Sequence, residues 1–128
     1  MFTTQQLSDA AATTDVESLT APSANGDAVL AKFKAAWPTA KMFLNNAKFV
    51  TGAKGDKIID EIIEGGDAIN GNATGEALKA AIKKIVSVWH MVRWPVNAVG
   101  AIIPGKAGKV IRAFIHIVDE LGEQYPAE

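Results

Sequence analysis

The chain has 128 residues, of which 48% are hydrophobic and 21% charged, and its formal net charge at neutral pH is −1. This length and composition predict one folded domain with a single hydrophobic core, and the chain is too short for the multilayer sheets of most nucleotide-dependent enzymes. It contains no cysteine, which excludes disulfide bonds, thiolate metal sites and cysteine nucleophiles.

The small net charge hides an uneven distribution along the chain. Residues 1–31 carry four acidic and no basic side chains, residues 32–112 carry all thirteen basic side chains against six acidic ones, and residues 113–128 carry four acidic ones. A basic middle between acidic ends favours neutralisation within the chain or by a neighbouring subunit, and it leaves an anionic partner as an alternative.

The first residues do not resemble an export signal. Met1 is not followed by the basic and then apolar segments of a signal peptide. We therefore expect a protein that is not exported by the Sec pathway. Its expected place is the cytoplasm or a particle assembled there, such as a virion, with peripheral attachment to a membrane as the alternative.

Residues 1–25 form a Ser/Thr-rich acidic segment with few large apolar side chains. Thr14 and Glu17 have the spacing of a capping box, but no sustained apolar period follows before Pro22. The sequence therefore predicts a flexible N-terminal arm, followed by a helical domain over residues 26–128.

Apolar residues recur every three or four positions from Asp27 onward, which predicts an amphipathic helix. Pro38 should kink or restart this helix near Trp37, because proline removes an N–H donor and clashes with the preceding turn. A short helix that starts at Asp56 is expected to end at Gly65–Gly66.

A long amphipathic helix is predicted from Glu76 to about Trp94, where Pro95 should break it. The last helix, from Lys109 to Leu121, has Gly122 in place to cap it. No segment alternates with a period of two residues. The predicted fold is therefore all-α, a bundle of four or five amphipathic helices.

The two halves of the domain share an order of features, which raises the hypothesis of half-repeats over residues 26–66 and 75–122. Each half runs from a glycine-acid-alanine start through a Trp-Pro pair, at Trp37 and Trp94, to a glycine- and lysine-containing turn and an apolar helix with acidic residues. The offsets between these paired features are unequal, whereas repeats normally keep a fixed period. Chance resemblance of short helices is the alternative.

The stretch from Lys79 to Arg112 carries seven basic residues and no acidic one, and its middle is nearly uncharged apart from Arg93. An apolar, tryptophan-containing segment with basic flanks is typical of a surface that binds a partner protein or an anionic membrane. Crossing a bilayer is disfavoured, because Arg93 is costly there and Pro95 breaks the helix. The predicted binding residues are Lys83, Lys84, Trp89, Arg93, Trp94, Lys106 and Lys109.

Two motifs resemble reactive or ligand-binding sites but lack residues that such sites require. Gly100 to Lys106 has the spacing of a phosphate-binding loop, but Ala107 replaces the required Ser or Thr and Pro104 removes an N–H donor. His116 with the acids that follow it offers few metal ligands and reads better as a solvated helix face. We therefore expect no catalytic residue, no metal and no cofactor, and no small-molecule substrate. Nucleic acid is not expected either, because the net charge is slightly negative.

These observations favour a non-enzymatic structural or assembly protein. It would self-associate into a homo-oligomer, or dock on a partner within a larger assembly, through apolar helix faces and the basic Trp-containing stretch. The alternative is a peripheral or membrane-active protein that inserts residues 89–104 into a lipid bilayer.

Overall fold

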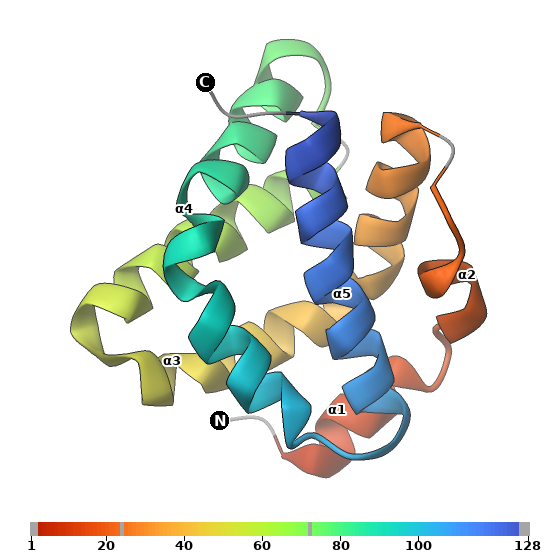
Figure 1. The fold of residues 1–128 in the computed structure, drawn as a ribbon, viewed down its shortest axis with the longest axis vertical. Coiled ribbons are helices and arrows are strands. Elements are labelled where there is room, and N and C mark those ends of the chain that lie inside the picture. Colours follow the sequence, from red (N-terminus) through yellow and green to blue (C-terminus); the bar gives the residue numbers. More distant parts are fainter. Residues whose placement is uncertain (1–2, 24, 72, 126–128) are drawn as a thin grey trace.

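Every regular element in the described part of the chain is an α-helix, which confirms the predicted all-α class (Figure 1). The computed structural model describes residues 3–23, 25–71 and 73–125. Helices α3, α4 and α5 pack against one another, and two short N-terminal helices lie against α3 and α5. The helices are α1 (Thr4–Ala11), α2 (Val16–Thr20), α3 (Gly26–Asn70), α4 (Gly75–Ala101) and α5 (Gly105–Gln124).

Helix α3 is interrupted at Gly52. Gly52 has φ 75° and ψ 176°, a backbone conformation that glycine adopts readily and other residues avoid. Pro38 lies inside the first half of α3, so the helix does not restart there. Pro95 lies inside α4, so the predicted break at Pro95 is wrong. With the two halves of α3 counted separately, six helices pack together in the described residues, where the sequence predicted four or five.

Gly65 and Gly66 do not end a helix, because α3 continues to Asn70. A Cβ atom added to Gly66 would lie 2.1 Å from Cη2 of Trp37, and one added to Gly65 would lie 2.9 Å from the carbonyl oxygen of Ala81. These glycines let other parts of the core approach the backbone of α3 closely, which a side chain would prevent. The predicted stop signal is instead a packing site.

The N-terminal segment, predicted to be a flexible arm, forms α1 and α2 over the described residues. Thr3 and Gln6 form a reciprocal capping box at the start of α1, which the sequence prediction missed. Asp15 caps α2 by accepting hydrogen bonds from two backbone N–H groups. Leu7, Ala11 and Leu19 are buried, so the segment contributes to the core where the sequence predicted an unpacked arm.

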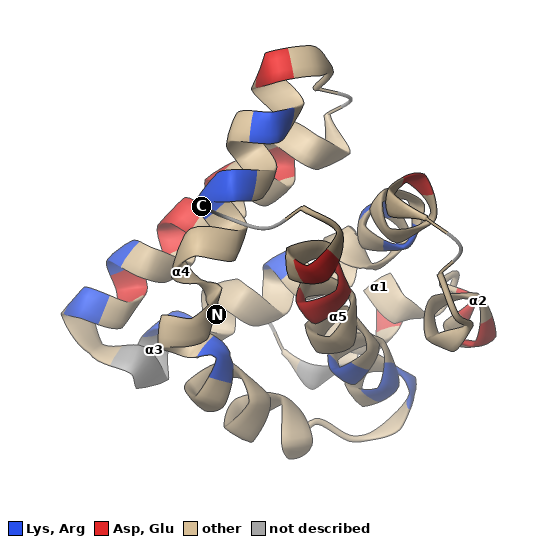
Figure 2. Cartoon of the chain, turned by 45° about the horizontal axis from the view of Figure 1, so that its top comes forward, with Lys and Arg blue, Asp and Glu red and all other residues tan. Residues whose placement is uncertain are grey.

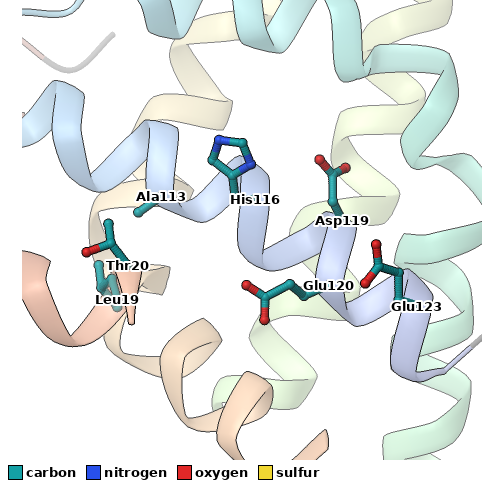
Figure 3. Close-up of a pocket in the computed structure, with 7 residues that line it drawn as sticks. All are labelled: Leu19, Thr20, Ala113, His116, Asp119, Glu120 and Glu123. Atoms are coloured by element: carbon teal, nitrogen blue, oxygen red, sulfur yellow. The ribbon is translucent and has the colours of Figure 1, made fainter. Parts of the chain in front are cut away.

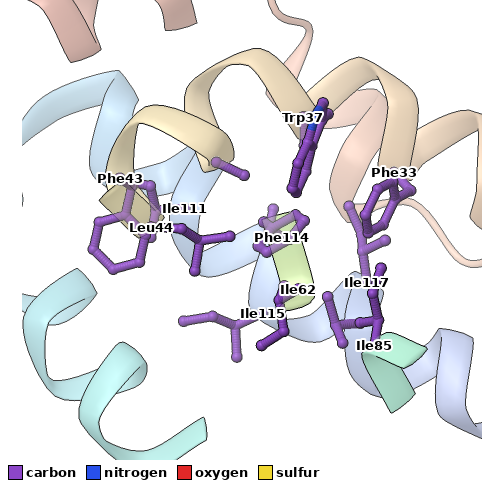
Figure 4. Packing of buried hydrophobic residues seen from close by; sticks show 14 of the residues in the cluster. Phe33, Trp37, Phe43, Leu44, Ile62, Ile85, Ile111, Phe114, Ile115 and Ile117 are labelled. Carbon is purple, nitrogen blue, oxygen red and sulfur yellow. The ribbon is translucent and has the colours of Figure 1, made fainter. Parts of the chain in front are cut away.

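Phe114 of α5 lies at the centre of the aromatic core, in contact with two tryptophans from different helices. Figure 4 shows it beside Trp37. Its ring centroid is 6.0 Å from that of Trp37 and 6.4 Å from that of Trp89. Phe33 stacks on Trp37 with a centroid distance of 5.3 Å. One side of α5 is buried, as expected of an amphipathic helix, and it consists of Val110, Ile111, Phe114, Ile117, Val118 and Leu121.

Candidate functional site

Trp89, Arg93 and Asp119 form a hydrogen-bonded cluster that joins α4 to α5. The indole Nε1 of Trp89 donates to Oδ1 of Asp119 at 3.0 Å. Arg93 donates from Nε to the same oxygen at 3.0 Å and from Nη2 to Oδ2 at 2.7 Å, which is the two-pronged arrangement that arginine forms with carboxylates. Trp89 is 5% exposed, so this cluster anchors a core side chain.

A second cluster with the same chemistry joins the two halves of α3. Nε1 of Trp37 donates to Oδ1 of Asp67 at 3.0 Å, and Nζ of Lys41 donates to Oδ2 at 3.0 Å. The sequence separations are also the same in the two clusters. Each tryptophan lies 30 residues before its aspartate, and each basic residue lies 26 residues before it.

The two carboxylates are held in their ionised form by these contacts. Burial raises the pKa of Asp119, but the hydrogen bonds from Arg93 and Trp89 and the charges of Arg93 and His116 more than offset that effect, so the pKa is lowered. For Asp67 burial likewise opposes ionisation, and the contacts with Trp37 and Lys41 lower its pKa overall. Both aspartates act as structural anions.

Three large apolar side chains on and just after the C-terminal half of α4 face away from the core. Met91 is 54% exposed, Trp94 78% and Ile102 79%. Ala98 and Ala101 are exposed as well, and these positions recur every three or four residues, so they form one stripe along the helix. We call this surface the Trp94 face and define it as Met91, Trp94, Ala98, Ala101 and Ile102.

A groove of about 460 Å³ adjoins the Trp94 face, between the second half of α3 and the middle of α4. Its lining is mostly apolar, and Lys54 supplies the one charged side chain in it. We call it the Lys54 groove. It is lined by Lys54, Gly55, Ile58, Met91, Val92 and Pro95.

The Trp94 face belongs to a part of the sequence without acidic residues. None occurs between Glu76 and Asp119, and α4 carries no charged residue after Arg93. Lys106 and Lys109 follow on the exposed side of α5, and Figure 2 shows basic residues near the start of α5 and acidic ones near its end. The Trp94 face is therefore an apolar surface whose sequence segment carries basic but no acidic side chains.

Of the seven residues predicted to bind a partner or membrane, three are buried or half-buried and have partners within the chain. Trp89 is buried and Arg93 is held by Asp119, as described above. Lys84 forms an ion pair with Glu64 at 3.0 Å. Trp89 is therefore a core residue and not part of the exposed surface.

The other four predicted residues are exposed. Trp94 lies at the centre of the exposed stripe, and Lys83 lies on the outer side of α4. Lys106 donates through Nζ to the carbonyl oxygen of Ala12 at 2.8 Å, so it holds the end of α1. Lys109 is one turn further along α5. The structure does not bring these four together into one compact site.

Met91, Ile102 and Lys54 are surface residues that the sequence prediction missed. A signal for Met91 was available, because it lies outside the apolar stripe predicted to be buried in the Glu76 to Trp94 helix. A large apolar residue on the polar side of an amphipathic helix indicates a surface with a partner. Lys54 gave no such signal, since its place in a groove depends on how α3 and α4 pack.

A second groove, of about 410 Å³, lies between α2 and α5 and has acidic margins (Figure 3). His116 lines it together with Asp119, Glu120 and Glu123, above the apolar side chains of Leu19 and Ala113. Among the described residues, no three histidine, aspartate or glutamate side chains group closely enough to hold a metal ion. This acidic groove is an electrostatic counterpart to the basic surroundings of the Trp94 face.

The segment with phosphate-loop spacing does not have the structure of such a loop. Gly100 belongs to the last turn of α4, and Gly105 begins α5 after a short turn. A phosphate-binding loop of this type follows a β-strand, and the described residues contain none. The glycines serve packing and the turn: a Cβ on Gly100 would lie 3.0 Å from Ile111.

Within the described residues, none of the helices combines the length and the apolar character needed to cross a bilayer. Comparison of the chain with protein-family models, with curated proteins and with solved structures finds no match.

Proposed function

We propose that this chain is a non-enzymatic assembly protein that docks through the Trp94 face onto an acidic protein surface. In a homo-oligomer that surface is provided by the next copy of the chain, at the acidic groove between α2 and α5. The observation that carries the proposal is the exposure of Trp94, Met91 and Ile102 on one helical stripe, beside a groove whose one charged side chain is Lys54.

The composition of the face supports a protein partner. Tryptophan and methionine are enriched at the centres of protein interfaces, whereas charged residues are depleted there. The acidic groove offers a complementary surface, with Glu120 and Glu123 above an apolar floor at Leu19. Because the basic face and the acidic groove are different surfaces, contact between them is head-to-tail and extends to a ring or a filament.

Sedimentation equilibrium over a range of protein concentrations tests the proposal. We expect a salt-sensitive increase in mass with concentration, and we expect Trp94→Asp to abolish it. Ala35→Asp is the matched control, because Ala35 is an exposed alanine on α3, away from the Trp94 face. A wild-type chain that remains a monomer at every concentration, or an association that Trp94→Asp leaves unchanged, would overturn the proposal.

A second candidate is binding to an anionic membrane surface, with residues 89–104 as the inserted segment. The exposed Trp94 and Ile102, followed in the sequence by the exposed Lys106 and Lys109, favour it, since tryptophan and lysine are common at membrane interfaces. Flotation with phosphatidylserine vesicles separates the two functions. Binding that Trp94→Asp removes would support the membrane function, and absence of binding would discard it.

We also propose that the helical domain consists of two copies of one helical hairpin, related by a constant offset of 52 residues without a gap. This register pairs Trp37 with Trp89, in place of the Trp37 and Trp94 pairing of the sequence comparison. Support comes from the two hydrogen-bonded clusters, whose three members all keep this offset. Identical residues elsewhere in the register are Ala28 and Ala80, Lys32 and Lys84, Asn45 and Asn97, Lys54 and Lys106, Lys57 and Lys109, Ile59 and Ile111, and Ile63 and Ile115.

A further inference from the structure

The offset of 52 residues gives the Lys54 groove a counterpart on the other hairpin. Lys54, Gly55 and Ile58 of α3 correspond to Lys106, Ala107 and Val110 of α5. Met91, Val92 and Pro95 of α4 correspond to Thr39, Ala40 and Phe43 of α3.

The counterpart groove is closed, whereas the Lys54 groove is open. Thr39 is 1% exposed, while the residue at its place in the Lys54 groove, Met91, is 54% exposed. Ala107 and Val110 are completely buried, while Gly55 and Ile58 are partly exposed. Equivalent positions therefore differ in whether another part of the chain covers them.

Helix α1 is the element in place to close the counterpart groove. It packs against both α3 and α5, and Figure 1 places it across the N-terminal end of α5. Leu7 and Ala11, four residues apart on one side of α1, are buried at 2% and 0% exposure. At the end of the helix, Lys106 Nζ donates to the carbonyl oxygen of the α1 C-cap, Ala12, at 2.8 Å.

Lys54, the counterpart of Lys106, lines an open groove, and no hydrogen bond or ion pair joins it to any described residue. Lysine at a helix C-terminus satisfies free carbonyl groups and interacts favourably with the helix dipole. The described part of the chain thus carries two corresponding grooves, each with a lysine, and one α1 helix.

We propose that the Lys54 groove binds a short amphipathic helix supplied by another protein chain, with the C-terminal carbonyl groups of that helix at Lys54. The bound helix has the character of α1: about two turns, an apolar residue and a small one four positions apart on the buried side, and no basic residue. Lack of basic residues suits the surroundings, because Lys57 lies close to Lys54 and Arg93 follows Val92. This inference goes beyond the proposed function, because the Lys54 groove adjoins the Trp94 face and receives a different element, a short helix.

A synthetic peptide covering residues 3–14 of this chain is a direct probe, since it reproduces α1 with its capping box. Titrated into the full-length isotopically labelled protein, it should shift the backbone amide signals of Gly55, Ile58 and Met91, and the indole signal of Trp94. The peptide with Leu7→Asp should produce no shifts, because the substitution places a charge on the buried side.

The role of Lys54 is tested with Lys54→Ala, whose matched control is Lys57→Ala with the same change in charge. We expect Lys54→Ala to raise the Kd of the peptide by about two- to fivefold, the range of one cation at an exposed helix terminus. Lys57→Ala should have a smaller effect. Equal effects of the two variants would overturn the assigned orientation of the helix.

Absence of shifts up to the solubility limit of the peptide would overturn the inference, as would shifts confined to Thr39, Ala107 and Val110. The latter pattern means that the peptide only exchanges with α1 in the closed groove. If the inference fails while sedimentation shows association through Trp94, the proposed function survives without it. If the peptide binds the Lys54 groove while the chain stays monomeric, the proposed self-assembly fails and the groove assignment stands.

Discussion

The Trp37 cluster and the Trp89 cluster each join a pair of helical segments, but the surfaces beside them differ in exposure. The Trp37 cluster lies in a part of the molecule that α1 and α2 help to cover, and the Trp89 cluster lies beside the open Trp94 face. Met42, which the 52-residue offset pairs with Trp94, is partly buried, whereas Trp94 is 78% exposed. The fold can thus cover this position, and its exposure in the second hairpin points to a partner.

The two buried tryptophans should contribute about equally to the free energy of unfolding, and the exposed one should contribute little. Trp37→Ala and Trp89→Ala should each lower the free energy of unfolding by about 3–5 kcal/mol, because each leaves a large cavity in the core. Trp94→Ala should change it by less than about 0.5 kcal/mol, since the side chain is exposed. Urea unfolding followed by circular dichroism measures all three. A large loss with Trp94→Ala alone would contradict the assignment of Trp94 to the surface.

Asp119 should contribute more to the free energy of unfolding than Asp67. Asp119→Ala removes the acceptor of Trp89 and of a two-pronged arginine, and should cost about 2–3 kcal/mol. Asp67→Ala should cost only about 1 kcal/mol, because the Asp67 side chain is 46% exposed against 30% for Asp119 and its basic partner is a lysine. The same unfolding measurement applies, with Asp119→Asn as the control that keeps an acceptor for Trp89. Equal losses at the two positions would show that burial does not govern these clusters.

Glycine substitutions sharpen the comparison further, because they should act in opposite directions. Gly66→Ala should destabilise the protein by about 1–3 kcal/mol, since its Cβ collides with the Trp37 ring. Gly122→Ala should stabilise by about 0.4–1 kcal/mol, because the nearest atom, Cγ1 of Val86, is 3.6 Å away and alanine favours the helix. Thermal unfolding of both variants decides the matter. Destabilisation by Gly122→Ala would indicate that the end of α5 is packed more tightly than described.

Acid should weaken both clusters. The pKa values of Asp119 and Asp67 are lowered in the folded protein, so near pH 4 the unfolded chain binds more protons. Their stabilising contribution is therefore fully present above the pKa of an unfolded aspartate and is lost as the pH falls through the folded values. The urea midpoint should decrease on acidification below about pH 4, and Asp119→Asn should flatten that decrease. An unchanged slope in Asp119→Asn would mean that Asp119 does not titrate differently on folding.

The sequence was sufficient to predict amphipathic helices after residue 26, because apolar residues at three- and four-residue spacing report burial directly, but it missed α1 and α2. It predicted a break at Pro95 and a possible restart at Pro38, where the helices continue because tertiary packing offsets the local penalty of proline. It took Gly65–Gly66 for a stop, since the reason for these glycines is the ring of Trp37, far away along the chain. Arg93 was recognised as unusual, but its partner Asp119 is 26 residues away and only the fold identifies it.

The prediction of the binding surface was partly successful for the same reason. Trp94 and the lysines stand out in a charge profile, whereas the separation of Trp89 from Trp94 depends on which side of α4 each residue occupies. Sequence order also suggested pairing the two Trp-Pro motifs, although the hydrogen-bonded clusters support pairing Trp37 with Trp89. Equivalent side-chain contacts define the proposed register better than short similar motifs in the sequence.

Acrylamide quenching of tryptophan fluorescence, measured from low to high protein concentration, tests the central claim most directly. Trp37 and Trp89 are buried at 2% and 5% exposure, so the quenchable emission belongs to Trp94. If the Trp94 face is the docking surface, the quenchable fraction should fall and the emission should shift to shorter wavelength as the chain assembles. A mass increase in sedimentation with Trp94 still fully quenchable would contradict the account, because assembly would then use a different surface.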